Sequence, residues 1–373
     1  MRTKLAKWSV LLLLLLLLLG LPLLGVALAG HPLDRYLEFP PITHYVEHAP
    51  VSWLMFVGLT VFVLGTTGPF LLKILTSPLP AATGSLARHP FPWWGWLGVG
   101  ITAVAWVLAW NRFAWLGELQ RHTFTPLWIG YILVVNALAF GRSGRCLLLN
   151  RPRFVLALFP LSAAFWWFFE YLNRFVQNWY YEGISDIGPL EYFLYATPPF
   201  ATVLPAVLST TAWLATFPRL DAPLRNLWPI RIPLTRVAGW VVLLVSGAGL
   251  MGIGLWPDYL FPLLWISPLL VITALQAICG EETVFARLRH GDWRPVWVPA
   301  LAALLCGFFW ELWNFGSLAH WEYAVPYVHD FQLFEMPLLG YAGYLPFGLE
   351  CVVIADFLRD PRERMRMFAQ MTS

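Results

Sequence analysis

The chain has 373 residues and a formal net charge of +3; 59% of its residues are hydrophobic and only 12% are charged. An ordinary soluble domain has roughly a quarter of its residues charged, so this composition argues against a soluble enzyme and predicts a membrane protein. The small positive charge comes from arginines between the apolar segments, and it indicates no nucleic-acid partner.

Apolar segments long enough to cross a bilayer recur along the whole chain. A spanning helix needs about 17 to 25 residues, and helices are expected because lipid cannot satisfy free backbone groups. The expected fold class is therefore all-α, a polytopic helical membrane protein. About ten transmembrane helices are predicted, at residues 8–29, 51–73, 93–110, 125–141, 153–176, 191–215, 236–256, 258–279, 296–316 and 336–357.

The first segment also has the three parts of a secretory signal: a basic start, a leucine run and the small-residue sequence Ala27-Leu28-Ala29. Its apolar part is longer than that of most signals, which favours an uncleaved anchor helix. Both alternatives place residue 30 on the outer side of the membrane.

Basic residues predict the orientation, because they gather in alternate connections while the intervening loops lean acidic. Both termini are expected in the cytoplasm, in the inner (plasma) membrane of the cell. The basic residues in the first three cytoplasmic segments are Arg2, Lys4, Lys7, Arg142, Arg145, Arg151, Arg153, Arg219, Arg225, Arg231 and Arg236.

An internal repeat organises the chain. The segment LWIGYILVVNAL at 127–138 matches LWISPLLVITAL at 264–275, and FWWFFEYLN at 165–173 matches CGFFWELWN at 306–314. Each copy holds four spans, so the two copies share one orientation, as in parallel-repeat transporters with sites at the repeat interface. The predicted units are a two-helix N-terminal preface (1–92), repeat 1 (93–215), a cytoplasmic linker (216–235), repeat 2 (236–357) and a basic cytoplasmic tail (358–373).

The candidate catalytic residues are the Glu and Asn that end corresponding helices, Glu170 with Asn173 and Glu311 with Asn314. An ionisable group in a span usually faces a cavity or a partner. Arg174 follows Glu170 by four residues, which predicts an ion pair that keeps Glu170 ionised. Glu311 has no such cation and is expected to be protonated more easily. The alternative is that Glu and Asn only join helices through hydrogen bonds.

Aromatic residues flank both carboxylates and supply the remaining candidate binding residues, together with Arg174. A Trp-x-Tyr sequence follows each helix in an outer loop. Such rings can line an apolar pocket and stabilise positive charge. The aromatic binding candidates are Trp179, Tyr181, Trp310, Trp313, Trp321 and Tyr323.

Glu350 is the deepest acid, about 20 Å into the last span at the usual helical rise. It is a further candidate binding residue. Deep acids are rare, so it marks either a proton or cation path or a hydrogen bond between helices. Proline and glycine residues at 337–348 predict a break in this helix, as in many transporters.

Other motifs are less informative. The sequence His44-Tyr-Val-Glu-His48 has the H-x-x-E-H spacing of a zinc site, but it lies in a short loop with Pro50 following, so we predict no metal and no cofactor. The helices ending in Glu beside tryptophans, each followed by Trp-x-Tyr, resemble in a few residues per copy the membrane-embedded carotenoid cyclases. That resemblance implies acidic residues that protonate a polyene. The four-helix unit departs from that family.

Three functions remain open from the sequence. The protein could be an enzyme that acts on a lipid or isoprenoid at the outer face of the membrane, with Glu311 as acid and Glu170 as base or orienting anion. It could instead be a transporter or channel with its path at the repeat interface. A structural subunit is the third alternative. The expected partners are membrane lipids and a hydrophobic small-molecule substrate, with no nucleic acid.

Overall fold

The computed structural model describes residues 2–78, 89–184, 187–231 and 236–358. The predicted basic tail lies outside the described residues except for Leu358, as do residues 79–88 of the preface and 232–235 of the linker. The first ten α-helices are α1 (Arg2–Leu28), α2 (Asp34–Leu37), α3 (Trp53–Thr76), α4 (Trp93–Trp110), α5 (Gly117–Gln120), α6 (Phe124–Ser143), α7 (Leu147–Asn150), α8 (Pro152–Val176), α9 (Pro189–Phe200) and α10 (Val203–Leu214).

The remaining elements include 3₁₀-helices, labelled η, and short strands. The α-helices are α11 (Pro218–Arg225), α12 (Arg236–Leu255), α13 (Pro257–Leu260), α14 (Ser267–Ile278), α15 (Arg294–Gly316) and α16 (Tyr344–Ala355). The 3₁₀-helices are η1 (Ala114–Leu116), η2 (Phe261–Trp265), η3 (Ala286–His290), η4 (Leu338–Gly343) and η5 (Asp356–Leu358), and the strands are β1 (Trp179–Glu182), β2 (His320–Tyr323), β3 (Gln332–Leu333) and β4 (Met336–Pro337).

Nine helical segments in the described part of the chain are long and apolar enough to cross a membrane. A tenth, made of Pro257–Trp265 and Ser267–Ile278, is bent by 52°. The expectation of a largely helical chain with many helices long and apolar enough to cross a membrane is confirmed. The segment predicted at 258–279 corresponds to this bent pair. Residues Leu338–Leu358 form one continuous helical segment of sufficient length and hydropathy, although it begins with the 3₁₀-helix η4.

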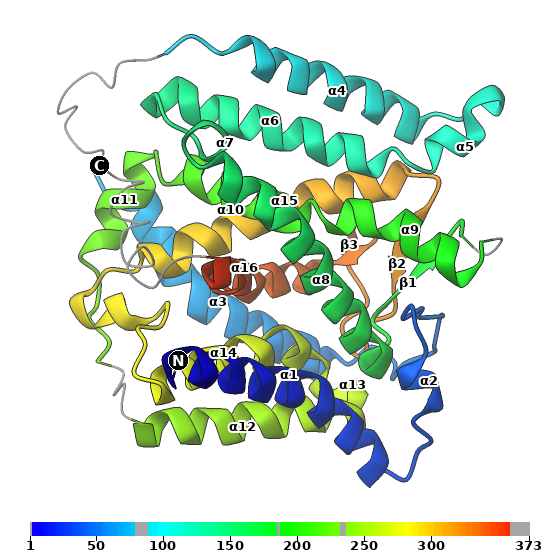
Figure 1. The fold of residues 1–373 in the computed structure, drawn as a ribbon, viewed down its shortest axis with the longest axis vertical. Coiled ribbons are helices and arrows are strands. Elements are labelled where there is room, and N and C mark those ends of the chain that lie inside the picture. The colour runs from blue at the N-terminus through cyan, green and yellow to red at the C-terminus, as the bar shows by residue number, and fades with distance from the viewer. Residues whose placement is uncertain (1, 79–88, 185–186, 232–235, 359–373) are drawn as a thin grey trace.

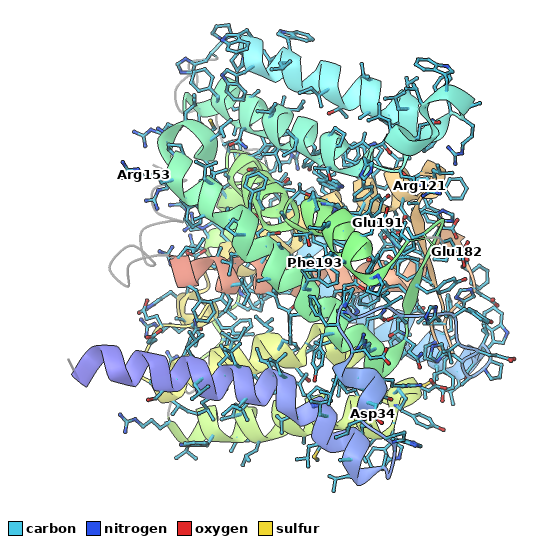
Figure 2. All side chains as sticks on the ribbon, turned by 45° about the vertical axis from the view of Figure 1, so that its right-hand side comes forward. Asp34, Arg121, Arg153, Glu182, Glu191 and Phe193 are labelled. Carbon is cyan, nitrogen blue, oxygen red and sulfur yellow. The ribbon has the colours of Figure 1, made fainter. Side chains whose placement is uncertain are left out.

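The long helices run side by side (Figure 1). The pair α4 and α6 lies at one end of the longest axis, α1 and α12 lie at the other, and α8, α10, α15 and α16 form the middle. Strands β1 and β2 lie at one end of the helices, and α7 and α11 lie at the opposite end. Figure 2 likewise shows Arg153, from a predicted cytoplasmic connection, opposite Glu182, from a predicted outer loop. Which end faces the cytoplasm stays a prediction.

Helix α1 packs closely against α12. A Cβ added at Gly25 would overlap the carbonyl oxygen of Met251, so the two backbones touch at this point. Val26 is fully buried, and the Tyr171 hydroxyl donates a hydrogen bond of 2.5 Å to the carbonyl of Leu19. Whether α1 is an uncleaved anchor stays a prediction.

Candidate functional site

Glu170 lies near the end of α8 and is completely buried. Its Oε1 accepts three hydrogen bonds, from Trp166 Nε1 at 2.9 Å, Trp179 Nε1 at 3.1 Å and the Tyr181 hydroxyl at 2.6 Å. Trp166 precedes Glu170 by one helical turn, whereas the other two donors come from β1. Oε2 is buried and has no hydrogen-bond partner among the described residues.

Glu311, on α15, is buried to the same extent but is held by different groups. Its Oε1 accepts hydrogen bonds from the hydroxyls of Tyr323 and Tyr344, each at 2.7 Å. Trp321 Nε1 donates to the Tyr323 hydroxyl at 2.9 Å, so this indole supports the carboxylate through the phenol. As at Glu170, Oε2 is buried without a partner in the part of the chain that the structure describes.

Gly307 accounts for the difference between the two sites. It lies 141 residues after Trp166, the same offset that separates Glu170 from Glu311. A Cβ at Gly307 would overlap the ring of Tyr344, so the glycine leaves the space that this ring fills. Trp166, from α8 itself, therefore donates to Glu170, whereas Tyr344, from α16, donates to Glu311.

Asn173 and Asn314 hold the two strands. The amide of Asn173 donates to the carbonyl of Trp179 at 2.7 Å, and its Oδ1 accepts from the backbone N–H groups of Asn178 and Trp179. The amide of Asn314 donates to the carbonyl of Trp321 at 2.7 Å and accepts from its N–H at 2.8 Å. Each asparagine thus forms hydrogen bonds with both the N–H and the carbonyl group of the tryptophan that begins a Trp-x-Tyr sequence.

The predicted outer loops form strands that pair with each other, which the all-helical prediction did not include. Strands β1 and β2 are antiparallel, with Trp179 opposite Tyr323 and Tyr181 opposite Trp321. At the centre of the pair, Tyr180 donates a hydrogen bond of 2.5 Å to Glu322. The pairing brings the donors of both carboxylates to one place in the molecule.

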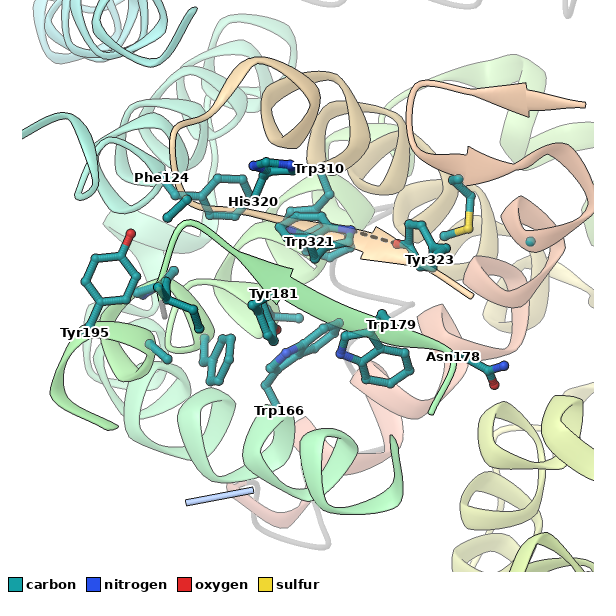
Figure 3. Close-up of a pocket in the computed structure, with 18 of the residues that line it drawn as sticks. Phe124, Trp166, Asn178, Trp179, Tyr181, Tyr195, Trp310, His320, Trp321 and Tyr323 are labelled. Atoms are coloured by element: carbon teal, nitrogen blue, oxygen red, sulfur yellow. Dashed lines mark hydrogen bonds between the residues drawn. The ribbon is translucent and has the colours of Figure 1, made fainter. Parts of the chain in front are cut away.

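An aromatic cavity of about 160 Å³ lies at this place, lined by all the direct donors of both carboxylates. Figure 3 shows Trp166, Trp179 and Tyr181 on the side of α8 and β1, and Trp310, Trp321 and Tyr323 on the side of α15 and β2. Glu170 and Glu311 themselves are not among the residues that line the cavity. Other lining residues that the sequence reasoning did not select are Trp265, Tyr192, Phe200 and Tyr344, with Arg121, His122 and His320 among the polar ones.

The two phenols that join the strands to the carboxylates keep their protons at neutral pH. Burial, together with the charge of Glu170, raises the pKa of Tyr181 well above its ordinary value. Burial and Glu311 raise the pKa of Tyr323 in the same way. Both groups are therefore hydrogen-bond donors toward their carboxylates.

The ion pair predicted between Glu170 and Arg174 does not form. Arg174 Nη2 donates instead to the carbonyl of Pro40 at 3.0 Å, and no described Lys or Arg lies within ion-pair distance of Glu170. The expectation that a cation distinguishes Glu170 from Glu311 is wrong. Arg174 does lie one helical turn after Glu170, as the spacing predicted. Its side chain, however, reaches Pro40 in the segment after α2, and residue spacing within α8 does not reveal that contact.

Two other candidates lie away from the cavity. Trp313 is buried in the helix core, where its ring contacts Trp128 with centroids 5.1 Å apart. Glu350 is also buried, and its Oε1 accepts a hydrogen bond of 3.1 Å from the N–H of Leu269 in the first turn of α14. This is the bond between helices that was one of the two interpretations of Glu350. It satisfies a backbone group exposed by the bend before α14.

The His44-x-x-Glu-His48 sequence forms no helix. His48 contacts Asp258 at 2.7 Å and the carbonyl of Gln177 at 3.1 Å. The described residues contain no cluster of three or more His, Cys, Asp or Glu side chains placed to hold a metal ion.

Comparisons with models of protein families, with curated proteins and with solved structures find no match to this chain.

Proposed function

We propose that the protein is an integral membrane enzyme that acts on a lipid or isoprenoid by carboxylate acid/base chemistry at the outer face of the membrane. The observation that carries this proposal is that the donors of two buried carboxylates line one aromatic cavity. Pockets for small molecules are typically apolar, with a few convergent polar groups. The expected substrate is a hydrophobic molecule drawn from the membrane.

The donors assign different roles to the two carboxylates. An indole N–H donates but cannot release its proton at neutral pH, and hydrogen bonds to the charged form favour that form. Glu170 receives two such indole bonds, from Trp166 and Trp179, so it is the base or orienting anion. Glu311 receives two direct bonds against three at Glu170, both from phenols whose hydroxyls can rotate away, so its protonated form is less disfavoured and it is the acid.

Protons reach the cavity through the phenols, because the carboxylates themselves do not line it. When Glu311 is protonated, the Tyr323 hydroxyl rotates from the carboxyl group toward the cavity. Tyr323 then gives its proton to a carbon–carbon double bond of the substrate while Glu311 gives its own proton to the Tyr323 oxygen. The substrate then carries a positive charge on carbon, next to aromatic faces that attract cations. Tyr181 takes a proton from the neighbouring carbon as its own proton passes to Glu170, and a double bond forms again. Proton exchange with water restores both carboxyl groups.

The experiment is mass spectrometry of lipid extracts from cells in which the gene is deleted. Further extracts come from the same deletion cells after a variant of the gene has been introduced. Glu311→Gln and Tyr323→Phe keep the shape of the site but break the proton path. Glu350→Gln is the matched control, because it removes a buried carboxylate outside the cavity. We expect one lipid species to disappear in the deletion, in Glu311→Gln and in Tyr323→Phe, and to persist in Glu350→Gln. Unchanged lipids in the deletion would reject the proposal.

A transporter is the second candidate, and the bent span favours it. The break between η2 and α14 lies where Glu350 contacts Leu269, and Glu350 Oε2 is buried without a partner among the described residues. Broken helices beside a carboxylate form the ion sites of many transporters. Proton-coupled uptake into vesicles that depends on Glu350 and not on Glu311 would favour transport over the enzyme.

A further inference from the structure

A second cavity, which shares no lining residue with the aromatic one, lies where α2 packs against α8 near the right-hand end of the helices in Figure 1. Its volume is about 400 Å³. The charged residues that line it are Arg35, Glu38 and Arg174, and they are joined by the polar residues Thr43, His44 and Gln177.

Arg174 is the feature that the rest of the fold does not explain. Its side chain is buried, and Nη2 donates to the carbonyl of Pro40. Nη1 is also buried and has no hydrogen-bond partner within the described ranges. A buried donor without an acceptor is costly, and more so when it carries charge, so an acceptor from outside the chain is expected at this position.

Arg35 adds a second positive charge at the rim. It is exposed, and its Nη2 donates to the Tyr36 hydroxyl at 2.8 Å and to Gln177 Oε1 at 3.4 Å. Within the described residues, its Nε and Nη1 donors are left for a ligand. Glu38 lines the same cavity, yet its carboxylate lies within ion-pair distance of neither arginine. The chain therefore brings two arginines together without neutralising either of them by direct contact.

We propose that this cavity binds a phosphate group, with Arg174 at its floor and Arg35 at its rim. Planar guanidinium groups match the oxygens of phosphate, and two of them can share its charge. The position of the cavity at the C-terminal end of α8 puts it beside the headgroup region of a bilayer, so the phosphate comes from a lipid headgroup or from solution. The site is independent of the enzyme proposed above.

The test measures the thermal unfolding of the purified full chain in a non-ionic, phosphate-free detergent. The probes are inorganic phosphate and a short-chain phosphatidic acid, each compared with chloride at equal ionic strength. We expect phosphate-dependent stabilisation, with affinity about tenfold weaker in Arg174→Gln and in Arg35→Gln, since each removes a charge-assisted contact. Arg112→Gln is the matched control, because it removes an arginine beside α4 and α5, far from this cavity in sequence, and it should bind as the wild type does.

The pattern of the probes identifies the source. Stabilisation by both probes supports a site for free phosphate, and stabilisation by the phosphatidic acid alone supports a lipid headgroup. Arg35 is exposed, so Arg35→Gln tests the site even if Arg174→Gln fails to fold. The proposal is overturned if neither phosphate nor the phosphatidic acid stabilises the chain more than chloride does, or if Arg112→Gln weakens binding as much as Arg35→Gln.

Discussion

Glu170 and Glu311 lie near the ends of α8 and α15 and are equally buried, but their hydrogen bonds come from different parts of the chain. Trp166, on the same helix, serves Glu170, whereas Tyr344, from another helix, serves Glu311 in the space left by Gly307. A buried carboxylate must be hydrogen-bonded, and the two sites meet this requirement with donors from different parts of the chain, three at Glu170 and two at Glu311.

The largest loss of stability is expected when each carboxylate is replaced by alanine, and the two losses compare the sites directly. Glu170→Ala leaves three buried donors without an acceptor, at about 1–3 kcal/mol for each. Glu311→Ala leaves two phenols, whose hydroxyls can rotate toward other acceptors. Thermal unfolding in detergent should show Glu170→Ala to be the less stable variant. Equal losses would mean that the indole bonds contribute nothing.

Gly307→Ala tests how Tyr344 reaches its carboxylate. The added methyl group overlaps the Tyr344 ring, and overpacking of this kind costs about 1–3 kcal/mol. In a chain that already carries Tyr344→Ala, we expect Gly307→Ala to lower the free energy of unfolding by less than it does in the wild type. If the two substitutions add without interaction, the glycine does not make room for the ring.

Removing the asparagine bonds should weaken both sites in parallel. Asn314→Ala removes two hydrogen bonds to the backbone of Trp321, and a loss of about 1–3 kcal/mol is expected because buried backbone groups stay unpaired. Asn173→Ala should cost more, because Asn173 also bonds Asn178 and Thr43. Hydrogen exchange of the backbone in β1 and β2 would report the loosening. An unchanged exchange rate in both variants would contradict this role.

Asp292, unlike Glu170 and Glu311, is paired with a cation, Arg294. Its replacement is expected to give the smallest of the effects described here. Burial raises its pKa, but the hydrogen bonds and charge of Arg294 outweigh burial and leave the pKa of Asp292 below its ordinary value. A lowered pKa stabilises the fold above the unfolded value of about 3.9, and that contribution is lost as the pH falls through the folded value.

Asp292→Asn should therefore lower the free energy of unfolding by about 1–2 kcal/mol at pH 7. The difference from the wild type should shrink as the pH falls below 4, because the wild-type carboxyl is then neutral as well. Unfolding curves at pH 7 and at acid pH measure it. A difference that does not depend on pH would show that the charge of Asp292 is not what stabilises the fold.

The sequence by itself determined the helical class, the position of nearly every long apolar helix, and three of the five side chains that donate directly to the two carboxylates. Hydropathy is a local property, so the spans follow from composition along the chain. Trp179, Tyr181 and Tyr323 follow their carboxylates by 9 to 12 residues, and short connections bring them back. Trp166 also had a local signal, because it precedes Glu170 by one helical turn.

Only the tertiary structure decided which distant groups meet. Tyr344 reaches Glu311 from another helix, the strands pair across the molecule, and Arg174 turns away from Glu170 toward Pro40. These contacts depend on how helices pack and on where a side chain finds an acceptor, and residue spacing within one helix carries no information about either. The bend before α14 belongs here too, because the N–H of Leu269 beside the bend donates a hydrogen bond to Glu350 from α16.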